Sequence, residues 1–408
     1  MLRRAKMNRP KILENKSVMN AIYLGTLCSI AYLAVYFARN VLSVVTPQMI
    51  EGGYSESYIG RVSSVYFVFY AIGQLINGII GDKIKARYMI SFGLLLSAIT
   101  NVVFAYISYS HPVVALIAYG LTGFFMAMIY GPMTKVVAEN TEQIYAVRCT
   151  LGFTFASFIG SPLAGIIASF VVWQSVFLLS SISLFVMAVM CFIAFLVLEK
   201  KKIIKYNQFK LKEGEKGGIK TLIKRQIIKF TWISMITGVI RTTVVFWLPT
   251  YISQYLSFSS EQSAGIFTIA TFVISLTTFI AVFIYERLRR DMDLSLISMF
   301  TVSAICFALL YVVKQPVINI ILIVLAIMAS NGAATILWSI YCPSLYDTGM
   351  VSGATGYLDF VSYIAAAISS TLFADAVSVI GWGNLILIWM GLMIIGVLVS
   401  LPVKKKLN

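Results

Sequence analysis

The sequence predicts an all-α membrane protein in which twelve transmembrane helices form two pseudosymmetric six-helix bundles. Three observations predict this class: 59% of the 408 residues are hydrophobic, only 12% are charged, and the mean hydropathy is +0.89. A soluble domain carries about 25% charged residues. The apolar runs reach about 18 residues or more, the length at which a helix crosses roughly 30 Å of hydrocarbon. These observations exclude a soluble enzyme, a secreted disulfide scaffold and a disordered chain.

Twelve apolar stretches separated by polar breaks give the predicted spans. They cover residues 18–47, 57–80, 88–107, 113–137, 145–171, 176–197, 227–256, 262–284, 295–313, 317–340, 351–376 and 384–402. The segment between the sixth and seventh stretches is polar and lysine-rich and contains Gly217-Gly218, which is typical of a linker. We therefore expect an N-terminal six-helix bundle at 1–198, a cytoplasmic basic linker at 199–226 and a C-terminal six-helix bundle at 227–408.

The basic residues predict the orientation of the chain. Cytoplasmic loops carry an excess of Lys and Arg. With a cytoplasmic N-terminus, most of the 32 basic residues fall in inside segments, the exceptions being Arg39, Arg61, Lys229, Arg241 and Lys314. Both termini are therefore predicted to lie in the cytoplasm. The first apolar stretch is too long for a signal-peptide core, so no cleavable leader is expected.

Cysteine and histidine usage bears on cofactors. The five cysteines lie in or beside apolar segments and form no CxxC pair, and His111 is the single histidine. Neither a disulfide framework nor a metal site is indicated. No cofactor and no metal are expected.

The two halves repeat a charged turn at the end of their second helix. Such a repeat favours a transporter in which two bundles alternate access around a site near the midplane. We expect a conformational gate at the cytoplasmic ends of these helices, formed by Gly78, Asp82, Lys83, Arg87, Glu286 and Arg287. The alternative, more plausible for the second turn than for the glycine-spaced first, is that they are ordinary basic anchors at the membrane surface.

Three ionisable residues lie inside predicted spans, where such groups are costly and therefore suggest function. Arg39 lies in the first span, with Tyr32 and Tyr36 on the same helical face. Arg241 holds the equivalent position in the seventh span. Two guanidinium groups at equivalent positions would repel each other unless an anion bound both of them. A planar, multi-donor cation suits phosphate or carboxylate oxygens.

Other interpretations of these polar residues remain open. Each arginine could instead pair permanently with an acid on a neighbouring helix. Asp359, in the eleventh span, could be a counter-ion to an arginine, a proton-carrying carboxyl, or a hydrated group near the cytoplasmic mouth. Gln74 and Asn331 could contact a ligand or join helices by hydrogen bonds.

Four motifs carry a resemblance to a known family. They are Tyr32-x3-Tyr36-x2-Arg39-Asn40 with Pro47, Gly78-x3-Asp82-Lys83-x3-Arg87, Arg241-x5-Trp247-x-Pro249-Thr250-Tyr251, and Gly353-x2-Gly356 followed by Gly381-Trp382. With these motifs the whole chain resembles the major facilitator superfamily, and within it the organophosphate:phosphate antiporters that include glycerol-3-phosphate and hexose-phosphate transporters. The resemblance implies the major facilitator fold. It also implies that Arg39 and Arg241 bind the phosphoryl group, with Tyr32 and Tyr36 as hydroxyl donors.

The chain departs from that family at three places. Gln74 stands where its characterised members carry a lysine, and Phe155, Ala156 and Ser157 stand where they carry a histidine. Asp359 lies in a span that is uncharged in them. A less positive cavity makes a less charged anion, a substrate with its own amine, or proton coupling through Asp359 more credible.

These observations predict a secondary active transporter of a small organic anion. The favoured cargo is a phosphorylated metabolite, exchanged for inorganic phosphate by rocker-switch alternating access. The expected substrate-binding residues are Arg39, Arg241, Tyr32, Tyr36, Gln74, Asn331 and Asp359. The alternatives are a proton-coupled carrier of another organic anion or zwitterion that uses Asp359, and a transporter-like sensor of phosphate esters.

The expected setting of the protein follows from the same class. We expect a monomer in a bacterial cytoplasmic membrane whose partners are the anionic solute and the lipid bilayer, and no nucleic acid. An enzyme is not expected, because no nucleophile and base and no set of metal ligands occur together in the sequence.

Overall fold

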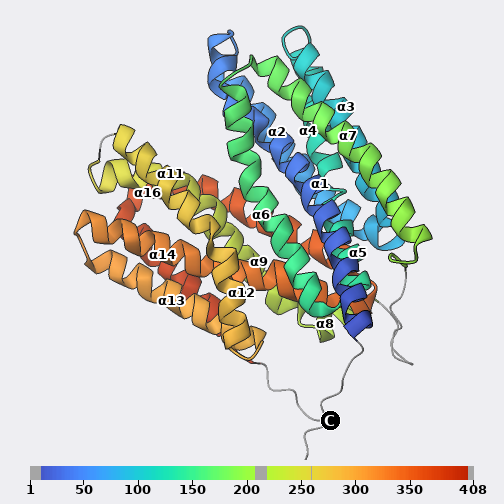
Figure 1. Ribbon diagram of the computed structural model, residues 1–408. Helices are drawn as coiled ribbons and strands as arrows, with labels where there is room; N and C mark the ends of the chain where they lie inside the picture. Colours follow the sequence, from blue (N-terminus) through green and yellow to red (C-terminus); the bar gives the residue numbers. More distant parts are fainter. Residues whose placement is uncertain (1–10, 207–217, 259, 403–408) are drawn as a thin grey trace, which may run out of the picture. The chain divides into compact units, whose positions relative to one another are not determined.

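The computed structural model describes residues 11–206, 218–258 and 260–402 (Figure 1). Every regular element in these ranges is helical, and 12 helical segments are long and apolar enough to cross a membrane. The first of them is Ser17–Thr46 and the last is Val379–Ser400. The predicted all-α membrane class and its number of spans are confirmed. The middle of the predicted linker, 207–217, lies outside the described residues.

The chain divides into two compact units. The first unit contains Met1–Glu215 together with Pro343–Gly353, and the second contains Lys216–Cys342 together with Ala354–Asn408. A short segment from the second half of the sequence therefore packs with the first unit.

The first unit is a bundle of long helices. α1 packs along α6, α2 packs on α4, and α3 lies between α4 and α7. α4 and α5 together form one candidate span, Pro112–Asn140. The elements are α1 (Lys11–Glu51), α2 (Glu56–Lys83), α3 (Ala86–Ile107), α4 (Pro112–Met126), α5 (Tyr130–Asn140), α6 (Gln143–Ala168) and α7 (Trp173–Lys200), followed later in the chain by the turn η4 (Leu345–Thr348).

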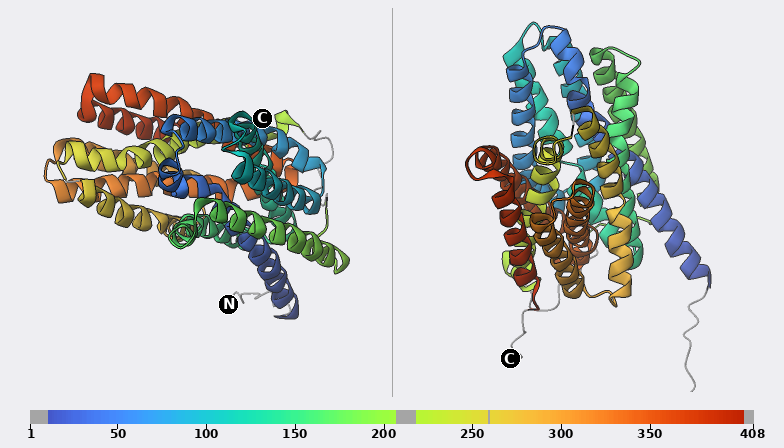
Figure 2. Two further views of the ribbon diagram at one scale, coloured as in Figure 1. Left: turned by 90° about the horizontal axis from the view of Figure 1, so that it is seen from above. Right: turned by 90° about the vertical axis from the view of Figure 1, so that its left-hand side faces the viewer.

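The second unit contains helices that are interrupted by π-helical turns. π-Helical turns are rare in proteins, and those that occur are frequently found at functional sites. α13 and α14 run side by side in both Figure 1 and Figure 2. The elements are α8 (Ile219–Lys224), α9 (Ile227–Val239), η1 (Ile240–Val244), α10 (Val245–Thr250), η2 (Tyr251–Tyr255), α11 (Ser260–Ser275), α12 (Thr277–Arg287), α13 (Met292–Val312), α14 (Pro316–Thr335), η3 (Ile336–Tyr341) and α15 (Cys342–Ser344); η1, η2 and η3 are the π-helical turns.

The helix α16 (Val351–Ser400) carries the last two candidate spans. Gly381, near the start of the second of these spans, has φ 74° and ψ 168°, a conformation that glycine adopts without the steric cost of a side chain. The sequence placed the gap between the last two predicted spans at 377–383. The structure instead turns the chain at one glycine and keeps helix on both sides, because a single residue with positive φ is enough to redirect it.

A buried lysine fastens the end of α16 within the second unit. Lys229 is only 7% exposed, and its Nζ lies 2.8 Å from Asp293 Oδ1. The same ammonium donates to the backbone oxygen of Ser400 at 2.8 Å. A cation is favourable at a helix C-terminus, where the last carbonyl groups lack partners within the helix. Lys229 thus joins the starts of α9 and α13 to the end of α16.

Replacing Lys229 should destabilise the protein. Lys229→Ala removes a charged hydrogen bond and an ion pair, and we expect the free energy of unfolding to fall by about 2 kcal/mol. Unfolding in mixed micelles with increasing sodium dodecyl sulfate measures this change. Lys220→Ala on α8 is the matched control, because Lys220 is exposed. Equal stability of the two variants would show that Lys229 does not hold these helix ends together.

Candidate functional site

Arg39 lies among aromatic rings in the first unit. Its Cζ lies 4.5 Å from the ring centroid of Tyr70, 5.3 Å from that of Tyr36 and 5.8 Å from that of Phe67. Tyr36 precedes Arg39 on α1, whereas Phe67 and Tyr70 come from α2. Aromatic faces attract a cation, with about 2 kcal/mol or more when the pair is desolvated. The rings therefore lower the cost of placing this guanidinium within a span.

A pocket of about 460 Å³ opens beside Arg39. Its walls come from α1, α2 and one residue of α4, and its polar lining is supplied by hydroxyl and amide groups. The lining residues are Arg39, Asn40, Leu42, Ser43, Thr46, Ile59, Gly60, Ser63, Tyr66, Phe67 and Tyr119. The combination of one cation with several hydroxyl groups suits a small, hydroxylated anion.

Sequence reasoning missed several members of this pocket. Ser43 and Thr46 follow Arg39 by four and seven residues, so helical spacing was a usable signal for both. The α2 residues Ser63 and Tyr66 carry no such signal, and neither does Tyr70, whose ring lies beside Arg39 outside the pocket lining. They come near α1 only through the packing of two helices, which a single sequence does not show.

Tyr32 and Tyr36 lie together, as their spacing predicted. Their ring centroids are 4.9 Å apart, and the Tyr32 ring also stacks on that of Tyr130 at 5.4 Å. Tyr32 is buried, whereas Tyr36 is half-buried and touches Arg39. The structure thus brings Tyr36 to the guanidinium and leaves Tyr32 one layer deeper in the bundle.

Gln74 follows Tyr70 by one turn of α2 and is 1% exposed. Its Nε2 makes no hydrogen bond to any described residue. A buried donor without a partner costs about 1–3 kcal/mol. In the second unit, Asn331 Oδ1 on α14 is likewise buried without a hydrogen bond in the described ranges. Both side chains therefore offer unused hydrogen-bonding capacity.

Arg241 lies in the π-helical turn η1 of the second unit. α9 and η1 run parallel to α16: Ser234 Oγ donates to Leu358 O at 2.6 Å, and the Thr243 and Ser369 hydroxyl oxygens are 2.9 Å apart. In this register Asp359 lies nearer the N-terminal ends of the two helices than Arg241 does. Helical side chains lean toward the N-terminus of their helix, so Arg241 leans toward the level of Asp359.

Asp359 is 7% exposed, within α16. The third role considered for it, a hydrated carboxylate at the cytoplasmic mouth, does not fit this burial.

The predicted gate residue Asp82 caps the start of α16. Its Oδ1 accepts from the backbone N–H of Ser352 at 2.9 Å, and its Oδ2 accepts from that of Gly353 at 2.7 Å. A Cβ at Gly353 would lie 2.6 Å from Asp82 Oδ2, so the close approach depends on glycine. The first N–H groups of a helix lack partners within the helix and attract a carboxylate. Gly78 is buried one turn earlier on α2.

Lys135 caps the other side of the same junction. It is 5% exposed, and its Nζ donates to the backbone oxygens of Asp82 at 2.5 Å and Gly81 at 3.4 Å. The ammonium thus compensates the C-terminus of α2, while the Asp82 carboxylate compensates the N-terminus of α16. Sequence reasoning had treated Lys135 only as an inside-facing charge.

Arg87 contacts a different part of the first unit from Asp82. Its Nη1 lies 2.8 Å from Glu199 Oε2 at the end of α7, and Tyr206 donates to Glu199 Oε1 at 2.8 Å. Lys205 N also donates to Asn140 Oδ1 at 2.7 Å. Burial and the hydrogen bond to Glu199 raise the pKa of Tyr206 above its usual range. These contacts hold residues 201–206 against the first unit.

The remaining predicted gate residues are exposed. Lys83 lies at the end of α2, and Glu286 and Arg287 lie at the end of α12. Arg287 Cζ lies 5.3 Å from the Phe283 ring centroid. Within the described part of the chain, Glu286 and Arg287 form no ion pair. Their exposure is that of basic and acidic anchors at the membrane surface, whereas Asp82 is half-buried and binds backbone amides.

Comparison with known families decides the class of this protein. The sequence profile described as Major Facilitator Superfamily matches residues 28–370. The chain belongs to the Major Facilitator Superfamily. The relatives that the chain resembles are named as transporters or as a membrane sensor protein, and the chain has 12 apolar helices, so its class is that of a multi-pass membrane transporter rather than an enzyme.

Two curated relatives and one solved structure illustrate the likeness. The chain is 27% identical over 262 residues to the glycerol-3-phosphate transporter of Bacillus subtilis. This match covers 57% of this chain and only 58% of that protein. It is 24% identical over 402 residues to the phosphoglycerate transporter protein of Salmonella typhimurium, covering 89% and 83%. The proton:xylose symporter XylE superposes with a TM-score of 0.71 at 13% identity, covering 94% and 95%. That structure supports the fold alone.

The Asp82 cap predicts a measurable protection of α16. In Asp82→Asn, a side-chain NH2 group replaces one carboxylate oxygen. Because this group cannot accept a hydrogen bond, the charge and one of the two hydrogen bonds from the Ser352 and Gly353 amides are lost. We expect the Ser352 and Gly353 amides to exchange hydrogen at least about tenfold faster, which corresponds to the loss of about 1.5 kcal/mol. Hydrogen–deuterium exchange of the peptide that contains them measures this rate. Asp291→Asn, which alters the N-cap of α13, is the control, and unchanged exchange in Asp82→Asn would exclude the cap.

Proposed function

We propose that this transporter exchanges a small phosphorylated metabolite for inorganic phosphate by alternating access. The observation that carries the proposal is the Arg39 guanidinium, placed within a span beside a 460 Å³ pocket whose lining includes Asn40, Ser43 and Ser63. The relatives named as transporters of glycerol-3-phosphate and phosphoglycerate support the same chemistry.

Arg39 suits a phosphoryl group better than a neutral solute. Ring contacts hold a guanidinium through its faces. Its N–H donors lie at its edge, where two phosphate oxygens can be bound side by side. Asn40, Ser43 and Ser63 then face the organic part of the ester within the pocket.

The proposal gives Arg241 the same chemistry in the second unit. Gln74 supplies an N–H donor, Asn331 supplies a carbonyl acceptor for a substrate hydroxyl, and Tyr36 supplies a hydroxyl. Asp359 serves as counter-ion to Arg241 when no anion is bound. In this proposal the two arginines repel each other when no anion is bound, so the carrier changes its access state only with an anion bound. Each transport step then needs an anion in both directions, which makes exchange obligatory.

We propose that Asp82 stabilises one of the two conformational states of the carrier. Its carboxylate accepts hydrogen bonds from the first amides of α16 in that state, and breaking these hydrogen bonds permits the other state. We further propose that the protein is a monomer in a bacterial cytoplasmic membrane with both termini in the cytoplasm. The basic residues of the sequence support that orientation.

Conservative replacement of either arginine tests the proposal. Arg39→Lys and Arg241→Lys keep the charge but lose the two-pronged geometry. We expect each to reduce phosphate counterflow into phosphate-loaded proteoliposomes at least about thirtyfold, the equivalent of about 2 kcal/mol. Arg61→Lys, at an exposed site on α2, should transport normally. Near-normal counterflow in Arg39→Lys would refute the proposed role of this guanidinium.

A second candidate function rests on the burial of Asp359. A carboxyl group that is 7% exposed within a span has the position of a proton carrier. A proton-coupled carrier of another organic anion or zwitterion would accumulate solute along a pH gradient without internal phosphate.

Accumulation driven by a pH gradient separates the two candidates. Exchange predicts none in vesicles that lack internal phosphate. Proton coupling predicts accumulation that is lost in Asp359→Asn and kept in Asp291→Asn, whose carboxyl group lies at an exposed helix cap. Accumulation in the wild type with this pattern would replace the exchange proposal.

A further inference from the structure

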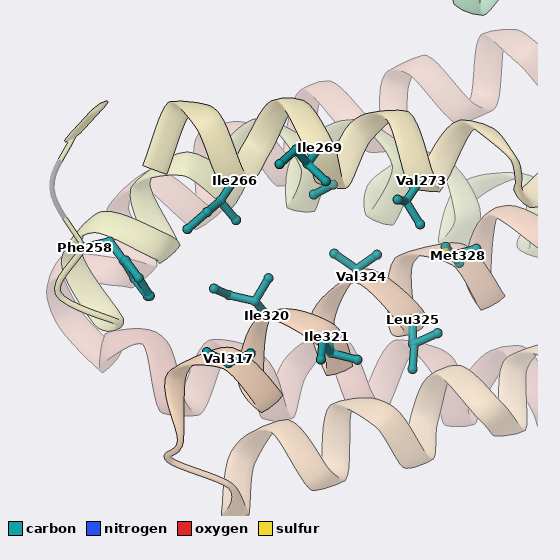
Figure 3. A pocket seen from close by; sticks show the side chains of 11 residues that line it. Phe258, Ile266, Ile269, Val273, Val317, Ile320, Ile321, Val324, Leu325 and Met328 are labelled. Atoms are coloured by element: carbon teal, nitrogen blue, oxygen red, sulfur yellow. The ribbon is translucent and has the colours of Figure 1, made fainter. Parts of the chain in front are cut away.

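An apolar groove of about 480 Å³ lies between α11 and α14 in the second unit (Figure 3). Every side chain that lines it is apolar. Ile269 and Val273 come from α11, and Ile320 and Val324 come from α14. Both helices belong to candidate membrane spans, and Ile269 is 68% exposed in this unit. A wholly apolar, exposed surface on membrane spans suits contact with lipid hydrocarbon.

The groove has the length of one leaflet. It runs along α14 from Val317 to Met328, and Figure 3 shows these residues near its opposite ends. At 1.5 Å per residue this distance is about 16 Å, which is half of the roughly 30 Å hydrocarbon thickness. Val317 lies in the first turn of α14, at the membrane surface, so the groove ends near the midplane.

The volume limits what the groove can enclose. A helix segment about 16 Å long and about 10 Å across fills more than about 1,000 Å³, so a helix could insert only one of its faces. A single extended hydrocarbon chain can be enclosed along the whole length of the groove.

A cation lies at the surface end of the groove. Lys314 Nζ donates to Tyr255 OH at 3.0 Å and to the backbone oxygen of Tyr311 at 3.0 Å. Lys314 precedes Val317 by three residues, and Tyr255 precedes Phe258 by three, so the ammonium lies near the end that these two residues line. Lysine and tyrosine are the residues that contact lipid headgroups at membrane surfaces.

We propose that this groove binds one acyl chain of an anionic phospholipid, whose phosphate contacts Lys314. Within hydrocarbon, affinity for the chain comes from close packing against the groove walls rather than from burial of apolar surface. Preference for a charged headgroup comes from Lys314, because a basic residue near the membrane surface contributes about 1 kcal/mol toward anionic lipid. This site is independent of the substrate and of the exchange mechanism.

Native mass spectrometry of the delipidated protein tests the proposal. With equal amounts of phosphatidylglycerol and phosphatidylcholine, both palmitoyl-oleoyl, we expect one retained lipid and a two- to fivefold preference for phosphatidylglycerol. Val324→Trp fills the groove and should lower retention at least about tenfold. Lys314→Gln should keep retention but abolish the headgroup preference.

Matched variants make the result specific. Ile305→Trp places the same bulky ring on an exposed position of α13 outside the groove and should retain lipid normally. Ile269→Trp blocks the groove from its α11 wall and repeats the test if Val324→Trp does not fold. The proposal would be overturned if both blocking variants retained lipid normally, or if Ile305→Trp lost as much lipid as they do. It would also be overturned if Lys314→Gln kept the preference for phosphatidylglycerol, or if the protein formed a dimer without bound lipid.

Discussion

The cost of keeping charge inside hydrocarbon governs the arrangement of this protein. An ion without compensation in a span costs several kcal/mol. The structure compensates its inward charges with three kinds of partner. Aromatic faces surround Arg39, helix C-terminal carbonyls accept from Lys135 and Lys229, and helix N-terminal amides donate to Asp82. Each charge therefore fixes the position of a helix, and losing its partner costs stability.

Helix ends carry much of this compensation because they are the places where the backbone lacks partners of its own. Lys135 and Asp82 meet at one junction, where α2 ends and α16 begins. Together they neutralise two opposed helix dipoles with one cation and one anion. Several hydrogen bonds therefore depend on this one junction, and the loss of either charge removes at least one of them.

Hydropathy and helical spacing predicted much of the fold from the sequence. The spans follow from apolar length, and the contact of Tyr36 with Arg39 follows from a spacing of three residues on one helix. These features are local, so one sequence contains them. The π-helical turn around Arg241 was not predicted, because such turns depend on how neighbouring helices pack.

Features that depend on distant contacts were beyond the sequence. The pairing of Arg87 with Glu199, rather than with the Asp82 junction, joins residues more than a hundred positions apart. Tyr70 over Arg39 and Ser352 at Asp82 likewise depend on contacts between different helices, which one sequence does not show. The predicted symmetry of the gate was also too simple, because Glu286 and Arg287 are exposed where Asp82 is half-buried.

We propose that the carrier changes state only with an anion bound. Efflux of labelled phosphate from loaded proteoliposomes, into medium with and without external phosphate or glycerol-3-phosphate, tests this proposal. Obligatory exchange predicts negligible efflux into anion-free medium and rapid efflux when an external anion is added. Equal efflux into both media would show that the empty carrier returns freely, and would contradict the proposal.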